Sequence, residues 1–496
     1  MNFPLLSAQE AARLIKDKEV LGIGGFSSVG TPKLVPMALA EYARELHSEG
    51  KEFKVGLITG GAAGSLIDGA LAQADAVFMR TPFQSDKDMR NSINSGKVAY
   101  FDLHLSHIGQ DVRYGFLPKI DVAIIEASDI TAEGEITLST SVGISPTLVQ
   151  QADRVIVELN RIHKGKLKGM HDIFLLDNPP YRKEIPIYRV NDRVGSCTLK
   201  VDPKKIVAVV ESEVKDRIAP FTPLNETTQR IGNNVAAFLL NEWSKGGIPK
   251  EFLPLQSGVG NVANAVLGAL GEDTHLPAFS MFTEVIQNSV IDLMMKGRIS
   301  FATGSSLTLS EDKLDMMYEN LDFFKERILL RPQEITNHPE MVRRLGIIAV
   351  NTALEADIFG NVNSTHVMGS KMMNGIGGSA DFSRNAFLSI FTTPSTAKDG
   401  LISSIVPQVS HVDSTEHDVR VLVTEQGVAD LRGKSPKERA ACIIENCAHP
   451  DYKELLWDYM KLSEGKAYHT PFSLKNALKM HLAFVETGDM RNTKFE

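Results

Sequence analysis

The chain alternates short β-branched runs with glycine-rich turns and helical patterns, and this alternation constrains its fold more than any other feature. In the first half, residues 20–26 and 54–59 have the composition of strands, and residues 32–46 between them have helical spacing. Strands that alternate with helices form mostly parallel sheets, because a parallel pair needs a long crossover connection. The sequence therefore predicts an α/β protein with open sheets.

Three stretches of the first half recur in the same order in the second half. The matched pairs are 93–102 with 293–303, 126–139 with 355–364, and 154–160 with 420–427. Matches in the same order indicate two related copies of one α/β unit. We therefore expect two tandem domains, residues 1–220 and 221–496.

Glu284 stands out by its place in the second copy. It follows an apolar run at 276–282, which we expect to be a strand, and precedes a helical pattern with Thr283 as the expected N-cap. Open α/β sheets bind ligands at the carboxyl ends of their strands. A carboxylate in a first helical turn faces unpaired backbone N–H groups, so we expect Glu284 to stay ionised at neutral pH.

The first copy carries a different residue at the matching position. Counting back 13 residues from Gly297 gives Glu284, and the same count from Gly96 gives Phe83. An acidic residue that served only the helix would be expected in both copies. The difference favours a special role for Glu284, against the simpler interpretation that a first-turn glutamate stabilises its helix.

The turn at 258–263 (GVGNVA) matches the GxGxxA form of the dinucleotide fingerprint. Glu284 lies 24 residues after Gly260, where an acidic residue would bind a ribose hydroxyl. The motif therefore favours NAD binding by a dehydrogenase. Such a turn also brings backbone N–H groups close to an acyl oxygen or a pantetheine chain. A second glycine-rich loop, 375–382, offers further donors for this alternative.

Charge, cysteine content and hydropathy exclude several functional classes. Lys plus Arg (53) against Asp plus Glu (61) gives a net charge of −8, and no basic run suited to nucleic acid occurs. The 3 cysteines lack a CxxC pair, which argues against a disulfide framework or a thiolate zinc site. The N-terminus lacks the apolar core of a signal peptide, and residues 252–271 are too polar to span a membrane. We expect a soluble cytoplasmic protein.

Two further segments have simple interpretations. Residues 411–418 (HVDSTEHD) fit no metal-ligand spacing, so we expect a hydrogen-bonded turn and no metal. Residues 164–205 are rich in proline and charge and show no periodicity, so we expect an excursion over the surface.

Seven stretches together resemble the acetyl-CoA hydrolase/transferase branch of class I CoA transferases along nearly the whole chain. They are SGKVAYFDLHLSH (95–107), QSGVGNVANAV (256–266), FTEVIQ (282–287), NHPEMVRRLG (337–346), KMMNGIGGSADFSRNAFLSIF (371–391), SSIVPQVSHVDSTEHDV (403–419) and VTEQGVADLRGKSP (423–436). They look most similar to the succinyl-CoA:acetate and propionyl-CoA:succinate transferases. The resemblance implies two CoA-transferase-type domains, a homodimer, and CoA exchange between an acyl-CoA and acetate, succinate or propionate.

The resemblance also implies roles for individual residues. Glu284 would attack the thioester and pass through an acyl anhydride and a glutamyl-CoA thioester, in a ping-pong cycle. Asn337 and Glu425 would orient it, and N–H groups at Val259, Gly260 and Gly378 would form the oxyanion hole. The implied CoA contacts are Gln256, Ser257, Gly258, Val259, Gly260, Asn374, Gly378 and Lys398. Ala380 stands where the family has glycine, a departure that bears on how closely a ligand approaches there. No metal or redox cofactor is implied, because CoA is a substrate.

Three alternatives stay open at this point. A hydrolase would let water intercept the acyl or glutamyl intermediate. An NAD-dependent dehydrogenase would use the GxGxxA turn. A non-catalytic acyl-CoA-binding protein would show no activity that depends on Glu284.

Overall fold

The computed structural model describes residues 3–218, 223–463 and 468–496 and divides into two compact units. The first unit comprises residues 1–220, 280–345 and 374–381, and the second comprises 221–279, 346–373 and 382–496. The predicted domains, 1–220 and 221–496, are continuous stretches of sequence and stay a prediction. Their predicted boundary falls in 219–222, outside the described residues.

The first unit contains a nine-stranded sheet with a largely parallel core. Its main path is β4 (Ala99–Tyr100), β3 (Val77–Thr81), β2 (Val55–Thr59), β1 (Val20–Ile23), β5 (Val122–Ile130), β6 (Glu135–Leu138) and β8 (Leu199–Lys200). Strand β7 (Arg154–Asn160) pairs in parallel with β5 and with β9 (Ile206–Ser212), whereas β5–β6 and β6–β8 are antiparallel. This sheet confirms the predicted α/β class in the first half of the chain.

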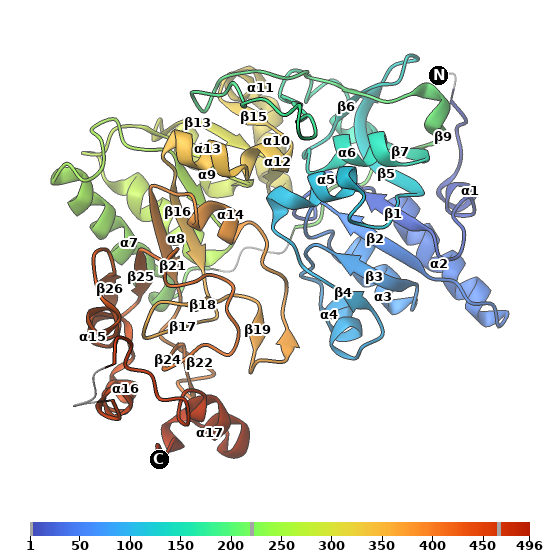
Figure 1. Ribbon diagram of the computed structural model, residues 1–496. Coiled ribbons are helices and arrows are strands. Elements are labelled where there is room, and N and C mark those ends of the chain that lie inside the picture. Colours follow the sequence, from blue (N-terminus) through green and yellow to red (C-terminus); the bar gives the residue numbers. More distant parts are fainter. Residues whose placement is uncertain (1–2, 219–222, 464–467) are drawn as a thin grey trace. The chain divides into compact units, whose positions relative to one another are not determined.

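Helices cover the strands of this sheet. Helices α1 (Ala8–Ala12), α2 (Leu34–Ser48) and α3 (Ala70–Gln73) contribute buried side chains to one apolar core with β1, β2 and β3, drawn in blue in Figure 1. The other helices of this part are α4 (Lys87–Asn94), α5 (Leu105–Tyr114) and α6 (Ser145–Gln151). Burial of small and branched residues on both faces explains why these strands read as continuous apolar runs.

The first unit also includes the segment around Glu284. Its strands are β11 (Phe279–Phe282), β12 (Val285–Gln287), β13 (Ile299–Gly304), β14 (Ser306–Thr308) and β15 (Ile328–Leu330). Its helices are α9 (Asn288–Met295), α10 (Glu311–Glu319), α11 (Leu321–Lys325), α12 (Gln333–Thr336) and α13 (Pro339–Leu345). Strand β13 pairs in parallel with β15, and β12 pairs in parallel with β14.

The predicted start of the helix after Glu284 was wrong. Residues Val285–Gln287 form strand β12, and helix α9 begins at Asn288 with Gln287, not Thr283, as its N-cap. The backbone of β12 is engaged by β14, and its β-branched Val285 and Ile286 suit a strand. The helix ends at Met295 with Lys296 as its C-cap.

The second unit has its own largely parallel run of strands. Strands β10 (Leu255–Ser257), β16 (Ile348–Thr352), β21 (Leu388–Thr392) and β25 (Val421–Thr424) pair in parallel in that order, and β26 (Gly427–Asp430) adds an antiparallel edge. Helix α7 (Glu226–Ser244) packs against α8 (Asn261–Glu272), which follows β10 through the glycine turn. The turn predicted at 258–263 thus connects strand β10 to helix α8.

Short strands and helices complete the second unit. The strands are β17 (Glu355–Asp357), β18 (Val362–Asn363), β19 (His366–Val367), β20 (Lys371–Met372), β22 (Thr396–Ala397), β23 (Ile402–Ser403) and β24 (Ile405–Val406). The helices are α15 (Pro436–Cys447), α16 (Pro450–Lys461) and α17 (Lys479–Thr487), drawn in dark red in Figure 1. All three helices contribute to an apolar core with β17 and β24.

The interpretation of residues 164–205 as a surface excursion was wrong for part of that segment. Leu167, Met170, Ile185 and Ile187 are fully buried. The segment has little regular secondary structure, so its apolar positions follow no helical or strand period. Tertiary packing therefore buries residues that periodicity alone did not mark.

None of the helices in the described ranges combines the length and the apolar character needed to cross a membrane.

Candidate active site

Glu284 lies just beyond the carboxyl end of β11, as the sequence predicted. Its main chain is fixed, because its carbonyl accepts hydrogen bonds from the backbone N–H groups of Ser305 at 2.7 Å and Ser306 at 3.1 Å. Its side chain is partly buried. The next residue, Val285, packs in a small apolar cluster with Phe26, Leu105 and Phe83.

Asn337 is the direct partner of this carboxyl group. It follows α12, is fully buried, and donates a hydrogen bond from Nδ2 to Oε1 of Glu284. Its backbone N–H donates to the carbonyl of Gln333 at 2.8 Å. The hydroxyl of Thr336 donates to Oδ1 of Asn337 at 2.9 Å, so both ends of the amide are engaged. Asn337 is thus hydrogen-bonded to Glu284, and its implied catalytic role stays a prediction.

The glycine-rich loop at 374–381 lies against the same carboxyl group. A Cβ added to Gly378 would lie 2.5 Å from both Nδ2 of Asn337 and Cδ of Glu284, and closer still to Oε1 of Glu284. No side chain fits in that space. Glycine is required at Gly378 because the loop backbone approaches the carboxyl group so closely.

Contacts from the first 110 residues hold this loop in place. The backbone N–H of Leu105 donates to the carbonyl of Gly377 at 3.3 Å, and Oδ2 of Asp102 accepts from the N–H of Ile376 at 2.7 Å. The hydroxyl of Tyr100 donates to the carbonyl of Asn374 at 2.5 Å. The predicted residues Asn374 and Gly378 thus belong to one anchored loop, together with Glu284 and Asn337 in the first unit.

Asp381 is a site residue that the sequence reasoning missed. It lies in α14 (Ser379–Ser383), and its Oδ2 accepts from Nδ2 of Asn337 at 3.3 Å. It also accepts from the backbone N–H of Ser106 at 2.9 Å and from the Ser106 hydroxyl at 2.6 Å. Asp381 and Ser106 lie in two of the stretches that carried the family resemblance, 371–391 and 95–107. Their place in these stretches was the only signal in the sequence reasoning that pointed to them. The partly buried Glu284 and the buried Asp381 therefore share one amide donor.

The electrostatics correct the prediction that Glu284 stays ionised at neutral pH. The pKa of Glu284 is raised to about 7, mainly by burial, while the hydrogen bond from Asn337 opposes the shift and the nearby Asp381 carboxyl adds to it. The pKa of Asp381 also rises to about 7 through burial. The expected help from a helix terminus is missing, because β12 separates Glu284 from α9. A carboxyl group with this pKa is a stronger base and nucleophile than an exposed one.

The other predicted site residues belong to the second unit. Gln256 and Ser257 are buried in β10, and Nε2 of Gln256 donates to Oδ1 of Asn351 at 3.3 Å. Gly258 donates its N–H to the carbonyl of Val350 at 3.2 Å. Val259 is 54% exposed at the tip of the turn. Gly260 is the N-cap of α8 with φ of 113°, a conformation that favours glycine.

Glu425 and Lys398 are also placed in the second unit. Glu425 accepts from the backbone N–H of Ser395 at 2.9 Å and from its hydroxyl. The ammonium group of Lys398 lies 4.9 Å from the centre of the Phe484 ring. The implied roles of both residues stay predictions.

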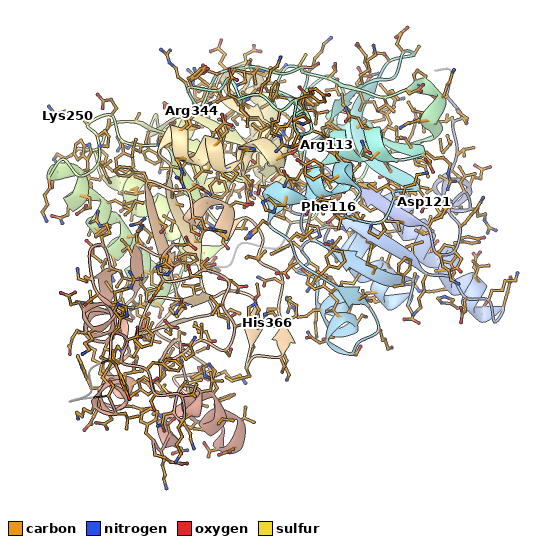
Figure 2. All side chains as sticks on the ribbon, viewed as in Figure 1. Arg113, Phe116, Asp121, Lys250, Arg344 and His366 are labelled. Atoms are coloured by element: carbon orange, nitrogen blue, oxygen red, sulfur yellow. The ribbon has the colours of Figure 1, made fainter. Side chains whose placement is uncertain are left out.

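The segment 411–418 forms the expected hydrogen-bonded turn. Asp413 accepts from the hydroxyl of Thr365 at 2.8 Å and lies 3.3 Å from Nε2 of His411. The imidazole of His411 packs at a tilt against that of His366, which is labelled in Figure 2 on the β19–β20 hairpin, with ring centres 4.0 Å apart. No cluster of three or more His, Cys, Asp or Glu side chains suited to a metal ion occurs in the described part of the chain.

Comparison with protein families gives two matches. The acetyl-CoA hydrolase/transferase N-terminal domain matches residues 3–211, and the acetyl-CoA hydrolase/transferase C-terminal domain matches residues 314–460.

Curated proteins align along nearly the whole chain. The succinyl-CoA:acetate CoA-transferase of Clostridium kluyveri is 49% identical over 98% of this chain and 90% of its own length. The propanoyl-CoA:succinate CoA transferase of Escherichia coli is 47% identical over 98% of both chains. The acetyl-CoA hydrolase of Schizosaccharomyces pombe is 46% identical over 96% of this chain and 94% of its own length.

Solved structures share the fold. RipA from Yersinia pestis superimposes with a TM-score of 0.70 at 22% identity, covering 92% of this chain and 96% of its own. The 4-hydroxybutyrate CoA-transferase from Porphyromonas gingivalis gives a TM-score of 0.62 at 21% identity, covering 92% and 97%. At this level of identity the likeness concerns the fold alone, and it confirms the predicted α/β architecture of the CoA-transferase type.

Proposed function

Because the chain belongs to the acetyl-CoA hydrolase/transferase family, we propose that it transfers CoA from an acyl-CoA to a short-chain carboxylate, with Glu284 as the covalent nucleophile. The single observation that carries this proposal is the Glu284 carboxyl group itself. It is partly buried and accepts a hydrogen bond from Asn337. It also lies against the loop backbone at Gly378, where there is no room for a side chain. Relatives named as CoA-transferases support the same reaction class.

The first half-reaction moves CoA onto the enzyme. A carboxylate oxygen of Glu284 forms a bond to the thioester carbon, and the carbon–sulfur bond breaks to release CoA thiolate. This leaves an acyl-glutamyl anhydride. The thiolate then attacks the glutamyl carbonyl carbon, and the acyl group departs as its free carboxylate. Glu284 is now a thioester of CoA, and no net proton has been consumed.

The second half-reaction repeats these steps in reverse with a new carboxylate. The incoming carboxylate attacks the glutamyl thioester, expels the thiolate and forms a new anhydride. The thiolate attacks the acyl carbonyl of that anhydride, and the Glu284 carboxylate leaves. The products are a new acyl-CoA and the regenerated enzyme, which is a ping-pong cycle.

Hydrogen-bond donors around Glu284 have two tasks in this cycle. The amide of Asn337 orients the nucleophile and stabilises the oxyanion that forms on the glutamyl carbonyl. Backbone N–H groups at Val259, Gly260 and Gly378 are proposed to stabilise the oxyanion on the acyl side. Donors of this kind contribute about 3–4 kcal/mol each to a transition state when they are held in place beforehand.

The remaining assignments follow from the family resemblance. CoA is proposed to contact Gln256, Ser257, Gly258, Val259, Gly260, Asn374, Gly378 and Lys398, and Glu425 is proposed to help orient the site. The cycle needs no metal or redox cofactor, because both leaving groups are stable anions. A homodimer is proposed as the assembly.

Hydrolysis is the second candidate function. It differs from transfer only in the final acceptor, since water can attack the same anhydride or thioester. Several relatives, including the one from Schizosaccharomyces pombe, are named acetyl-CoA hydrolases.

Product analysis separates the two functions. Acetyl-CoA incubated with succinate should give succinyl-CoA and acetate with little free thiol, and the reaction should stop in Glu284→Gln, which keeps the shape of the side chain. Thiol release that does not depend on succinate would make the protein a hydrolase. An unchanged rate in Glu284→Gln would refute covalent catalysis by this residue.

A further inference from the structure

Asp381 has an unusually well-fixed carboxyl group for a residue outside the proposed catalytic set. It is 5% exposed, and three hydrogen-bond donors from Ser106 and Asn337 converge on it. Two come from Ser106, through its backbone N–H at 2.9 Å and its hydroxyl at 2.6 Å. The third is Nδ2 of Asn337 at 3.3 Å. Because Ser106 is 275 residues from Asp381 in sequence, this arrangement is produced by tertiary structure and not by local turn geometry.

The orientation of the Asn337 amide depends on this carboxyl group. The nitrogen of a side-chain amide donates two hydrogen bonds and accepts none, whereas the oxygen only accepts hydrogen bonds. Here the nitrogen faces the carboxyl groups of Glu284 and Asp381, while the oxygen receives the hydroxyl of Thr336 at 2.9 Å. An ionised Asp381 accepts but cannot donate. It therefore favours the orientation that presents an N–H group, not a carbonyl, to Glu284.

We propose that Asp381 is a positioning residue for CoA transfer: anchored by Ser106, it holds the amide nitrogen of Asn337 on Glu284 and keeps a second negative charge beside the nucleophile. The inference rests on the proposed function, because it assigns a role within that same site. Asp381 touches neither the thioester nor the acyl group in this account. It acts through Asn337 and through its charge.

Other titratable groups on the surrounding elements are engaged elsewhere. Glu334 on α12 pairs with Arg113, which Figure 2 labels on α5, at 2.5 Å. Asp102 accepts the N–H of Ile376 at 2.7 Å. The remaining titratable residues on these elements are Tyr100, His104, His107, Asp111, Tyr114 and His338. Asp381 is the charged group that raises the pKa of Glu284 in addition to burial.

Removing the charge has two effects that a merely structural residue would not produce together. Without the neighbouring carboxylate, the pKa of Glu284 falls, so the acid limb of the pH–rate profile moves to lower pH. A less basic Glu284 with a misoriented Asn337 also attacks more slowly, so the rate at high pH falls.

The test compares Asp381→Asn with wild type in the pH dependence of single-turnover glutamyl-CoA formation from acetyl-CoA. We expect the plateau rate to fall by about tenfold or more, as for a misplaced donor. We also expect the acid limb to move down by roughly one pH unit. The matched control is Asp102→Asn, which makes the same chemical change at a carboxyl group that contacts the 374–381 loop through the N–H of Ile376 but is not hydrogen-bonded to Asn337 or Glu284. Its acid limb should stay where it is in wild type.

Each outcome decides the question. If Asp381→Asn has the plateau rate and the acid limb of wild type, the inference about Asp381 is wrong, while the proposed function stands. The same holds if Asp102→Asn shifts the acid limb as much as Asp381→Asn does. If Asp381→Asn does not fold, Ser106→Ala replaces it. That variant keeps the charge but loses the 2.6 Å anchor, so its plateau should fall with an unchanged KM for acetyl-CoA, and a wild-type plateau overturns the inference. If wild type forms no thioester at Glu284, the proposed function fails first.

Discussion

Gly378 lies directly against the carboxyl group of Glu284. A Cβ at this position would lie 2.5 Å from Cδ of Glu284 and nearer still to its Oε1, so the loop and the nucleophile share space that any side chain would fill. This contact ties the reactivity of Glu284 to the backbone of residues 374–381, and it leads to the first prediction.

We expect Gly378→Ala to lower kcat by about 100-fold or more, because the added methyl group displaces the carboxyl group from its donor and blocks the loop N–H. Steady-state kinetics of acetyl-CoA:succinate exchange measures the loss. Gly268→Ala in α8 is the control, since a Cβ there meets nothing within 4 Å. Full activity in Gly378→Ala would mean that the loop does not limit the nucleophile.

The activity should rise with pH through about 7. Burial and Asp381 raise the pKa of Glu284 to about 7, and only its ionised form attacks a thioester. The dependence of kcat/KM on pH reports this value for the free enzyme. An acid limb near the ordinary glutamate value of 4.5 would contradict the raised pKa.

The same shift predicts that Glu284→Gln stabilises the protein at alkaline pH. A carboxyl group whose pKa is raised on folding favours the folded state below its unfolded pKa of 4.5, and this contribution is lost as pH rises through about 7. Removing the buried charge should therefore raise Tm at about pH 8 and leave it nearly unchanged at about pH 4. Scanning calorimetry at the two pH values checks this. A lower Tm of Glu284→Gln at pH 8 would show that the ionised Glu284 carboxylate does not destabilise the folded protein.

Lys33 is buried and has no role in the proposed cycle, so its substitution tests stability alone. Its ammonium group pairs with Glu126 at 2.5 Å and with Asp216 at 2.8 Å, and all three side chains are nearly inaccessible to solvent. Lys33→Met leaves two buried carboxyl groups without their cation, which should destabilise the fold by about 3–5 kcal/mol.

Urea denaturation of the Lys33 variant measures this effect. Lys51→Met is the control, because Lys51 pairs with Glu49 at 2.7 Å on the surface, where water screens the charges. That change should be too small to resolve. Equal stability of the two variants would refute the importance of the buried cluster.

The sequence predicted the framework of the site well, because strands, glycine turns and helices leave local patterns. The clearest case is the pair Phe83 and Glu284. Each is the second residue after its strand, β3 or β11. A Cβ on Gly377 would meet the Phe83 ring at 3.3 Å, while Gly378 meets Glu284, so the two matching positions flank neighbouring glycines. The count back from Gly96 and Gly297 thus identified structurally matching positions.

What the sequence could not predict depends on contacts between distant segments. The pairing of Val285–Gln287 with Ser306–Thr308 overrides a helical pattern and removes the helix terminus expected at Glu284. The contact between Ser106 and Asp381 joins segments 275 residues apart, and no local period announces it. The raised pKa of Glu284 follows from burial, which single-sequence patterns describe only coarsely.

The proposed function requires Glu284 to become covalently joined to CoA during turnover. The most direct measurement is incubation with acetyl-CoA, reduction with borohydride, and intact-mass and peptide analysis of the enzyme. A glutamyl thioester is reduced to an alcohol, so we expect a modified peptide containing Glu284, absent from Glu284→Gln and from enzyme treated without acetyl-CoA. An unmodified enzyme that still exchanges CoA between acetyl and succinyl groups, or a modification at another residue, would contradict it.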